Sequence, residues 1–309
     1  MNPLVSIIVP TYEQEELAIE AARSALGQDY AELEVIVVDD ASPIARHSKL
    51  RAIEDPRLRF FRRSGNVGRT ENYRQSLRDL ARGKWAMILD GDDYLTDPSF
   101  VSCAMSAAAK DPEIVMVAAR SQTRTPHSSF VSAHPGTVTL PGLEMLKALP
   151  DMRYFLQHLA VIYRRADALA LDFYRSPTIS SDWESLYRLA SHGKIAFIDR
   201  VVGVWRIHDS NASSIRERRG LIDNLDIWEP IYAEAIAQGL PKNVARQRCI
   251  RVKRFMARQH IPKVARSWRD LMDYLSLLRQ QHPSAIAGLV EIKTLMQLAL
   301  ALTGYYRKR

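Results

Sequence analysis

The stretch KWAMILDGDDYLTDP at residues 84–98 places three carboxylates directly behind an apolar run. The run at 85–89 has the length and composition of a buried strand. Asp90, Asp92 and Asp93 then fall within four positions, where like charges raise one another's pKa values. Such a cluster is tolerated when a cation or hydrogen-bond donors balance it. The stretch therefore predicts a core strand and a binding site at its end.

Strands and helices alternate on both sides of this stretch. The alternation predicts right-handed βαβ units in an α/β fold, with a mostly parallel sheet covered by helices on both faces. Residues 121–142 are turn-rich and predict short antiparallel strands or a mobile loop. The predicted strands lie at 4–10, 34–40, 58–62, 85–90, 113–119, 159–165, 194–199 and 201–208, and the helices between them at 13–28, 69–83, 99–109 and 181–193.

The C-terminal third differs from the rest in charge and pattern. Residues 1–200 hold 24 Lys and Arg against 26 Asp and Glu, whereas residues 201–309 hold 19 against 9. From about residue 216 the pattern is entirely helical, with Pro262 separating two segments. We therefore expect an α/β domain at 1–215 and a basic, all-helical extension at 216–309. The second segment carries one apolar stripe, formed by Val264, Trp268, Leu271, Met272, Leu275 and Leu278.

Cysteine usage and the chain start favour a cytoplasmic protein. Cys103 and Cys249 lie far apart in predicted helices, which gives neither a disulfide framework nor a zinc spacing. The start MNPLVSIIVPTY lacks the features of a signal peptide. No run of about 18 apolar residues is present, so no spanning helix is expected.

Polar residues follow three of the predicted strands. The carboxyl ends of parallel strands meet at one sheet edge, where ligands bind. Five carboxylates at that edge suit Mg²⁺ or Mn²⁺, held together with a substrate's phosphates. No P-loop and no G-x-G-x-x-G follows the first strand, so the metal is expected to hold the phosphate. Each motif alone is also compatible with a turn or a helix cap; their order favours a site. The residues are Pro10, Thr11 and Tyr12, then Asp39 and Asp40, then Asp90, Asp92 and Asp93.

Four segments in this order resemble the family 2 glycosyltransferases of the GT-A fold: VSIIVPTYEQ, VIVVDDAS, GNVGRTENYRQSL and MILDGDDYL. A later segment, SDWESLYRLASHGKIAFIDRVVGVWRIHDSNASS, is similar to the part of the family that holds the catalytic carboxylate and an Arg-x-His-Ser element. The resemblance covers about residues 3–215. It implies a Rossmann-like GT-A domain and the inverting transfer of a sugar from a nucleotide-diphosphate donor, usually a UDP-sugar, as in bacterial surface-polysaccharide assembly.

The resemblance also implies a role for individual residues. Asp182 matches the general base, with a helix N-terminal carboxylate favoured by the dipole as the alternative. His208 matches a group near the diphosphate or the metal, with a structural histidine as the alternative. The implied metal ligands are Asp90, Asp92, Asp93 and His208. The implied donor contacts are Pro10, Thr11 and Tyr12 near the base, Asp39 or Asp40 on uracil, and Asn66, Gly68, Arg69, Asp90, Gly91 and Asp92.

The sequence departs from the family pattern at three places. Ser181 stands where many relatives have a glutamate before the base, so Glu184 either contributes instead or faces solvent. RTENYRQS replaces an Ala-Arg-Asn run. LDFYRSPTIS contains no glycine, although relatives have a glycine-led acceptor loop there.

The basic extension has several interpretations. Residues 242–269 hold ten Lys and Arg and no acid, and residues 286–309 are apolar almost all round. These helices could pack on the catalytic domain, form a homodimer, or dock on an anionic membrane near a glycan or lipid-linked acceptor. No nucleic-acid motif accompanies the charge. The rival functions are an inactive glycan- or nucleotide-binding protein and a sugar-phosphate nucleotidyltransferase, against which the acidic PTYEQEE counts.

Overall fold

Strand β1 (Val5–Thr11) lies between β2 (Leu33–Asp39) and β4 (Trp85–Ile88), and β3 (Leu58–Arg62) pairs with the outer side of β2. All of these pairs are parallel, so the strands end at the same sheet edge, as the apolar runs predict. The computed structural model describes residues 2–43, 48–208, 211, 218–264 and 267–286.

The second half of the sheet mixes directions. Strand β9 (Val161–Arg164) is antiparallel to β4 and to β6 (Ile114–Arg124), and β10 (Lys194–Arg206) is parallel to β6. The resulting order is β3-β2-β1-β4-β9-β6-β10-β5. The two strands predicted at 194–208 form the single strand β10, whose pairing shifts register at Phe197 and Val201. The turn-rich region does hold short antiparallel strands. These are β7 (Ser129–Val131) and β8 (Val138–Pro141), whereas the short strand β5 (Tyr94–Leu95), also antiparallel to its neighbour, follows β4 in the chain.

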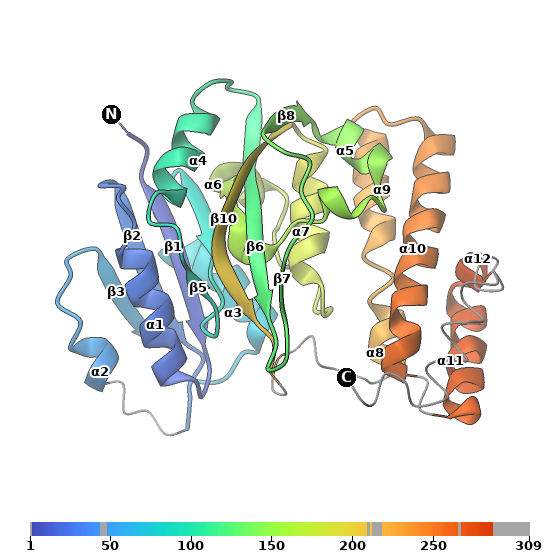
Figure 1. The fold of residues 1–309 in the computed structure, drawn as a ribbon, viewed down its shortest axis with the longest axis horizontal. Helices are drawn as coiled ribbons and strands as arrows, with labels where there is room; N and C mark the ends of the chain where they lie inside the picture. The colour runs from blue at the N-terminus through green and yellow to red at the C-terminus, as the bar shows by residue number, and fades with distance from the viewer. Residues whose placement is uncertain (1, 44–47, 209–210, 212–217, 265–266, 287–309) are drawn as a thin grey trace.

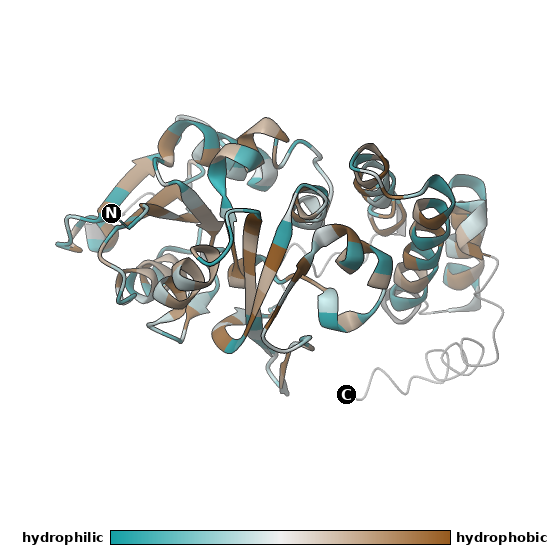
Figure 2. Cartoon of the chain, turned by 90° about the horizontal axis from the view of Figure 1, so that it is seen from above, coloured by the Kyte–Doolittle hydropathy of each residue, from teal (hydrophilic) through white to brown (hydrophobic). Residues whose placement is uncertain are grey.

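Helices cover both faces of the sheet (Figure 1). Alternate side chains of β1 enter two separate apolar clusters, one shared with α1 (Glu15–Leu26) and α4 (Phe100–Ala108), the other with α3 (Arg69–Gln75) and α7 (Ser181–Ala190). This burial on both faces explains why the strands are continuously apolar. Figure 2 shows these apolar strands, in brown, between the helix layers.

The C-terminal helices share one of these clusters. Trp228 is fully buried at the start of α9 (Trp228–Ala237), with its ring centroid 5.5 Å from Tyr187 and 6.2 Å from Trp183 of α7. The apolar core is therefore continuous across residue 215, and the domain boundary placed there stays a prediction. The other helices are α2 (Ser48–Arg51), a π-helical turn (Ser76–Leu80), α5 (Gly142–Ala148), α6 (Arg165–Ala170), α8 (Arg218–Asp223), α10 (Lys242–Val264), α11 (Trp268–Gln281), α12 (Pro283–Ile286) and two 3₁₀ turns (Met152–Tyr154, His158–Ala160).

Helix α5 begins at a position with no room for a side chain. A Cβ at Gly142 would lie 1.6 Å from the carbonyl oxygen of Ala190, the last residue of α7. The Gly142 N–H donates to the carbonyl of Gly193 at 2.8 Å. The start of α5 and the C-terminal end of α7 are therefore in direct backbone contact.

Two predictions for the C-terminal helices are wrong. Helix α10 continues through Pro262 instead of ending before it. In α11 the buried residues Leu271, Tyr274 and Leu278 follow helical spacing, whereas Met272 is rotated by about 100° from them and Trp268 lies at the helix start. These two side chains are 60% and 65% exposed. The predicted apolar helix at 286–309 lies almost entirely outside the described residues.

No helix in the described part of the chain combines the length and apolar character that crossing a bilayer requires.

The two tryptophans of the C-terminal helices give a matched pair of variants. Trp228→Ala leaves a cavity between α9 and α7 and is expected to lower the free energy of unfolding by about 3–5 kcal/mol. Trp268→Ala, at a largely exposed position, is expected to change it by less than about 0.5 kcal/mol. Urea unfolding monitored by circular dichroism measures both. Equal effects of the two variants would contradict the shared core.

Candidate active site

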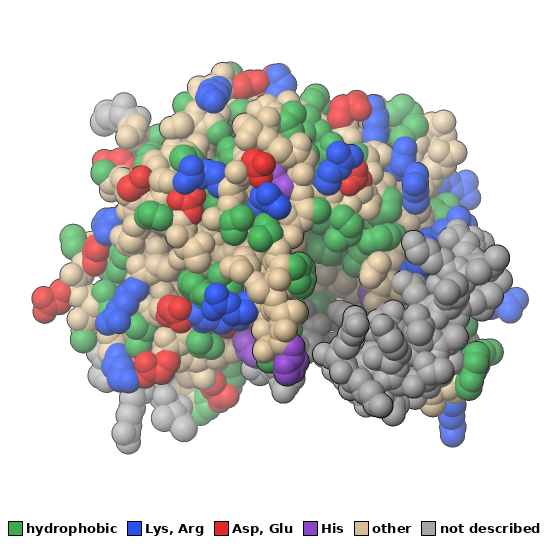
Figure 3. Space-filling view, viewed as in Figure 1, with side chains coloured by type: hydrophobic (Ala, Val, Ile, Leu, Met, Phe, Trp, Pro, Cys, Tyr) green, Lys and Arg blue, Asp and Glu red, His purple; other side chains and the backbone are tan. Residues whose placement is uncertain are grey.

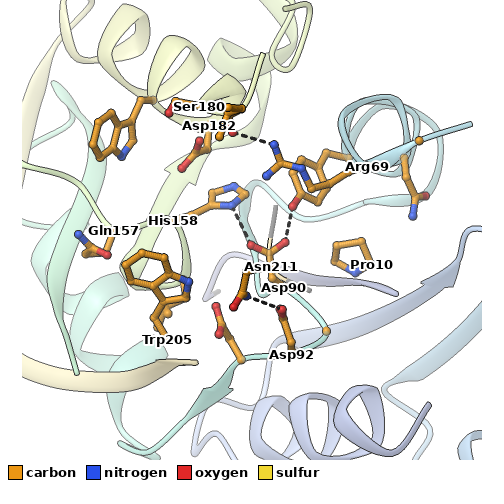
Figure 4. Close-up of a pocket in the computed structure, with 18 of the residues that line it drawn as sticks. Pro10, Arg69, Asp90, Asp92, Gln157, His158, Ser180, Asp182, Trp205 and Asn211 are labelled. Atoms are coloured by element: carbon orange, nitrogen blue, oxygen red, sulfur yellow. Dashed lines mark hydrogen bonds and ion pairs between the residues drawn. The ribbon is translucent and has the colours of Figure 1, made fainter. Parts of the chain in front are cut away.

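A cavity of about 490 Å³ opens at the edge where β1, β2 and β4 end. Its wall combines these strand ends with the start of α7 and the segment before β9 (Figure 4), together with residues of α10. Asp39 and His208, two of the predicted site residues, are not part of the wall. The other predicted residues line it: Pro10, Thr11, Tyr12, Asp40, Asn66, Gly68, Arg69, Asp90, Gly91, Asp92, Asp93 and Asp182.

The two acids after β2 have different surroundings. The Asp40 carboxylate lines the cavity and accepts hydrogen bonds from the backbone N–H groups of Val67 and Gly68, both at 2.9 Å. Asp39 is fully buried and accepts from the Ser42 amide at 3.1 Å and from Arg62 Nε at 3.2 Å. Asp40 is thus the member of the pair that can contact a ligand. Asp39 lies behind it and binds the turn at Ser42.

The end of β1 offers a polar atom without a partner. Thr11 Oγ1 is buried, and no described residue forms a hydrogen bond with it. The Tyr12 ring beside it is 41% exposed. Gly91 packs against this strand so closely that a Cβ would lie 2.6 Å from the Pro10 carbonyl oxygen. The arrangement suits a planar ligand with a hydrogen-bonding edge.

Asp90 is held by two side chains from other elements. The Tyr73 hydroxyl donates to its Oδ1, and His158 Nδ1 lies 3.6 Å from its Oδ2. Burial alone would raise the pKa of Asp90, but the hydrogen bond and charge of His158, the Tyr73 hydroxyl and the Arg69 charge outweigh it and hold that pKa below its usual range. Asp90 is therefore a firmly ionised group in the wall.

Asp92 lies beside a histidine and an amide. Its Oδ2 is 3.0 Å from His208 Nε2 and accepts from Asn211 Nδ2 at 3.0 Å. Burial, and then the negative charge of Asp90, raise the pKa of Asp92 above its usual range. The surroundings of Asp92 therefore disfavour its ionised form, and a nearby positive charge would stabilise it.

Asp93 is turned toward β10. It is 3% exposed and accepts a hydrogen bond from the Arg206 backbone N–H at 2.9 Å. Burial, followed by the charges of Asp92 and Asp90, raises the pKa of Asp93 well above its usual range. Its hydrogen bond ties the acidic motif to β10.

The Asp92–His208 pair is the part of the site best suited to a divalent cation. Among the described residues, no group of three or more His, Cys, Asp or Glu side chains is placed to hold a metal ion. Asp92 and His208 nonetheless offer a carboxylate oxygen and an imidazole nitrogen side by side. Mg²⁺ is usually held by one or two carboxylates, with phosphate and water completing its shell. The donor set fits a cation that binds together with phosphates.

Asp182 faces the same cavity from the first turn of α7 (Figure 4). Its carboxylate has no hydrogen-bond or ion-pair partner among the described residues. Arg69 contributes to this region by donating from Nη2 to the carbonyl of Ile179 at 2.7 Å. An ionised carboxylate with free lone pairs is able to accept a proton from a bound hydroxyl.

Glu184 does not face solvent, so that alternative is wrong. It is 1% exposed and forms ion pairs with Arg188 Nε at 2.7 Å and Arg175 Nη2 at 3.1 Å. Arg188 also donates to the Leu171 carbonyl at 2.6 Å, at the start of the loop that leads to Ser181. The glycine-free loop turns through left-handed residues, Asp172 at φ 50° and Tyr174 at φ 62°.

Several wall residues are not predicted from the sequence: Gln157, His158, Trp183, Trp205, Asn211, Asn224, Met256, Gln259 and His260. Gln157 and His158 precede β9, whose antiparallel direction brings its start to the edge where β4 ends. That direction is not visible in an apolar run. Asn224, Met256, Gln259 and His260 come from the C-terminal helices, for which no local pattern indicates a site.

Asp93→Asn tests the charge balance of the acidic motif. Because the folded state raises the pKa of Asp93, the folded protein binds this proton more tightly than the unfolded chain, and stability falls as the pH rises above about 4. Asparagine keeps an acceptor for the Arg206 amide. We expect Asp93→Asn to raise the free energy of unfolding at pH 7.5 in metal-free buffer, with the gain shrinking toward pH 4.

Thermal unfolding between pH 4 and 8 measures this gain. Asp29→Asn, at an exposed position, is the control. A lower midpoint for Asp93→Asn at pH 7.5, or a gain that does not depend on pH, would contradict the assigned surroundings.

Comparisons with known proteins identify the family and the fold of the chain. The sequence model of "Glycosyl transferase family 2" matches residues 6–167, more than half of the chain. The putative colanic acid biosynthesis glycosyl transferase WcaA of Escherichia coli (strain K12) is 37% identical over 97 residues, which are 31% of this chain and 34% of that protein. The succinoglycan biosynthesis protein ExoO of Rhizobium meliloti (strain 1021) is 37% identical over 91 residues, 29% of this chain and 26% of that protein. The chain thus matches only about a third or less of these two relatives.

Solved structures share the fold over nearly the whole chain. S. aureus TarS 1-349 in complex with UDP-GlcNAc has a TM-score of 0.73 at 16% identity, covering 99% of this chain and 92% of that one. The mannosyltransferase PcManGT from Pyrobaculum calidifontis, in complex with GDP-Man and Mn²⁺, has a TM-score of 0.60 at 18% identity, covering 100% and 87%. The predicted fold class is confirmed: the chain has the α/β GT-A fold and belongs to glycosyl transferase family 2.

Proposed function

We propose that the protein transfers a sugar, with inversion, from a UDP-sugar to a hydroxyl of a glycan or lipid-linked acceptor in surface-polysaccharide assembly. The observation that carries this proposal is a single cavity with three chemically distinct parts. Thr11, Tyr12 and Asp40 line one part, the Asp92 carboxylate another, and Asp182 a third. This is the set of groups that a nucleotide, its diphosphate and an attacking hydroxyl require.

The nucleotide part suits a uracil ring. Thr11 Oγ1 lacks a partner among the described residues, and the exposed Tyr12 ring offers a stacking face. The Asp40 oxygens each accept one backbone hydrogen bond, and a carboxylate has lone pairs for about four. Asp40 can therefore also accept from the ring N–H of uracil. TarS, bound to UDP-GlcNAc, shares the fold.

The diphosphate would be held with a divalent cation. Asp92 and His208 are the proposed ligands, with Asp90 and Asp93 adjacent. The cation would neutralise charge on the departing diphosphate. The mannosyltransferase neighbour was solved with GDP-Man and Mn²⁺, which supports Mn²⁺ or Mg²⁺ here.

Asp182 is the proposed base. The acceptor oxygen attacks the anomeric carbon opposite the diphosphate, Asp182 takes the hydroxyl proton, and the bond to the diphosphate breaks, so the configuration inverts. The acceptor would lie against the wall formed by Trp183, Met256 and Gln259, because these residues line the cavity on the side of α7 and α10.

Two carboxylate variants separate the proposed roles. Asp182→Asn is expected to lower the transfer rate on the order of 10²–10⁴-fold, the usual contribution of a general base, with UDP affinity unchanged within about twofold. Asp92→Asn is expected to abolish metal-dependent UDP binding. Calorimetry with UDP, with and without Mn²⁺, measures binding, and UDP release from a panel of UDP-sugars measures turnover.

Asp29→Asn is the control for these variants. The panel is first ranked by thermal shift, since a ligand that binds only the folded state raises the midpoint. Wild-type transfer by Asp182→Asn would show that the base is assigned incorrectly. Metal-dependent UDP binding that survives in Asp92→Asn would overturn the metal assignment.

We also propose that the C-terminal helices meet an anionic membrane that carries the acceptor. Figure 3 shows several Lys and Arg side chains along the side formed by these helices. Trp268 and Met272 are exposed on α11, and an apolar residue beside basic ones is typical of interfacial binding. The support comes from the described residues alone.

Co-sedimentation of the full chain with vesicles tests this contact. We expect binding to phosphatidylglycerol-containing vesicles and not to pure phosphatidylcholine, because each basic side chain near an anionic surface contributes about 1 kcal/mol. The double variant Trp268→Ser, Met272→Ser is expected to bind several-fold more weakly. Equal binding to both vesicle types, or none, would remove the proposal.

A further inference from the structure

The orientation of Asp182 depends on the backbone around it. Its carboxylate has no hydrogen-bond or ion-pair partner in the described part of the chain, where the charge of Arg69 acts on it without a direct contact. The direction of the carboxylate therefore follows from where the first turn of α7 is placed. The residues just before that helix, Ile179 and Ser180, are the ones that other elements hold.

Asn224 holds Ser180 through two hydrogen bonds. The Ser180 N–H donates to Asn224 Oδ1 at 2.9 Å, and Asn224 Nδ2 donates to Ser180 Oγ at 3.0 Å. Asn224 is 7% exposed, directly follows α8, and donates its own backbone N–H to the Gly220 carbonyl at 3.1 Å. The Asn224 side-chain amide thus uses both its donor and its acceptor on Ser180, which lies two positions before Asp182.

This pairing replaces an ordinary helix cap. Ser180 is the N-cap residue of α7, where a serine hydroxyl normally accepts a hydrogen bond from the helix's own N–H groups at a gain of about 1 kcal/mol. Here the Ser180 side chain makes no such bond. Its hydroxyl instead accepts from Asn224. The N-cap side chain of α7 therefore binds a residue that follows α8, and not the backbone of α7 itself.

The opposite side of the same segment is held from the nucleotide half of the cavity. Arg69, labelled in Figure 4, donates to the Ile179 carbonyl at 2.7 Å. Thr70 Oγ1 lies 3.5 Å from Ser181 Oγ. The segment before Asp182 is thus fixed between α3 and Asn224. Removing either side would leave the base free to swing.

We propose that Asn224 is a positioning residue for the transfer reaction: by holding Ser180, it aims the Asp182 carboxylate at the acceptor hydroxyl. The inference rests on the proposed role of Asp182 as the base. It makes the helical C-terminal part of the chain a component of the catalytic machinery. Displacing a catalytic group by about 1 Å is known to cost on the order of 10²-fold in rate.

Two substitutions at Asn224 test the proposal with the UDP-sugar that the wild-type protein turns over. Asn224→Ala removes both bonds and is expected to lower kcat about 10–100-fold, with the KM for the donor and the Kd for UDP with Mn²⁺ within about twofold of wild type. Asn224→Asp keeps the acceptor for the Ser180 amide and replaces the Nδ2 donor by a second acceptor, to which the Ser180 hydroxyl can donate. It is expected to retain most of the activity, with the acidic limb of the pH–rate profile at higher pH, because a nearby carboxylate raises the pKa of the base.

Hydrogen exchange provides a readout that does not need turnover. The Ser180 amide donates to Asn224, so a peptide spanning Ser180 is expected to exchange faster in Asn224→Ala. Gln238→Ala, which truncates an exposed amide at the end of α9, is the control and is expected to change neither exchange at this peptide nor kcat.

The outcomes separate the two proposals. Wild-type kcat or unchanged exchange in Asn224→Ala, while Asp182→Asn is inactive, would overturn the positioning role alone. Loss of UDP binding in parallel with kcat would show that Asn224 only supports the fold. Full activity of Asp182→Asn, or no turnover of any UDP-sugar by the wild-type protein, would instead refute the proposed function.

Discussion

Three carboxylates within four residues cannot share one environment, and the structure gives each a different partner. Asp93 binds the backbone of β10, Asp90 meets Tyr73 and His158, and Asp92 lies beside His208. These partners come from α3, the segment before β9 and the end of β10, while the charges of Asp90 and Asp92 still raise the pKa values of Asp92 and Asp93. The end of β4 thereby dictates where α3, the start of β9 and the end of β10 must lie, and the cavity is the space they enclose.

The sequence predicts what local patterns encode. Continuous apolar runs predict the parallel strands, and the acids that follow them predict the edge at which the cavity opens. The direction of β9 is not encoded locally, because an apolar run is compatible with either orientation. The place of His158 in the site depends on that direction and therefore cannot be predicted from the sequence. The same is true of the C-terminal wall residues, which only tertiary packing brings to the site.

The apolar stripe predicted in α11 also shows that a local pattern does not determine which residues are buried. Its apolar residues follow helical spacing, but the predicted stripe included Trp268 and Met272, which the fold leaves exposed. Periodicity identifies an amphipathic helix, while the part of its surface that is covered depends on where the neighbouring helix crosses. Which acid of the Asp39–Asp40 pair lines the cavity is likewise set by tertiary contacts. Ser42 and Arg62 bind Asp39 behind the wall, and the two acids alone give no sign of this.

The contact between Gly142 and Ala190 constrains how α7 is able to move. Backbone packs against backbone at its C-terminal end, and this close contact opposes a slide of the helix toward α5. Any adjustment of its opposite end during turnover must be a tilt about this fixed point. A tilt sweeps the first turn sideways across the cavity, so the position of Asp182, the proposed base, depends on a contact at Ala190, eight residues away.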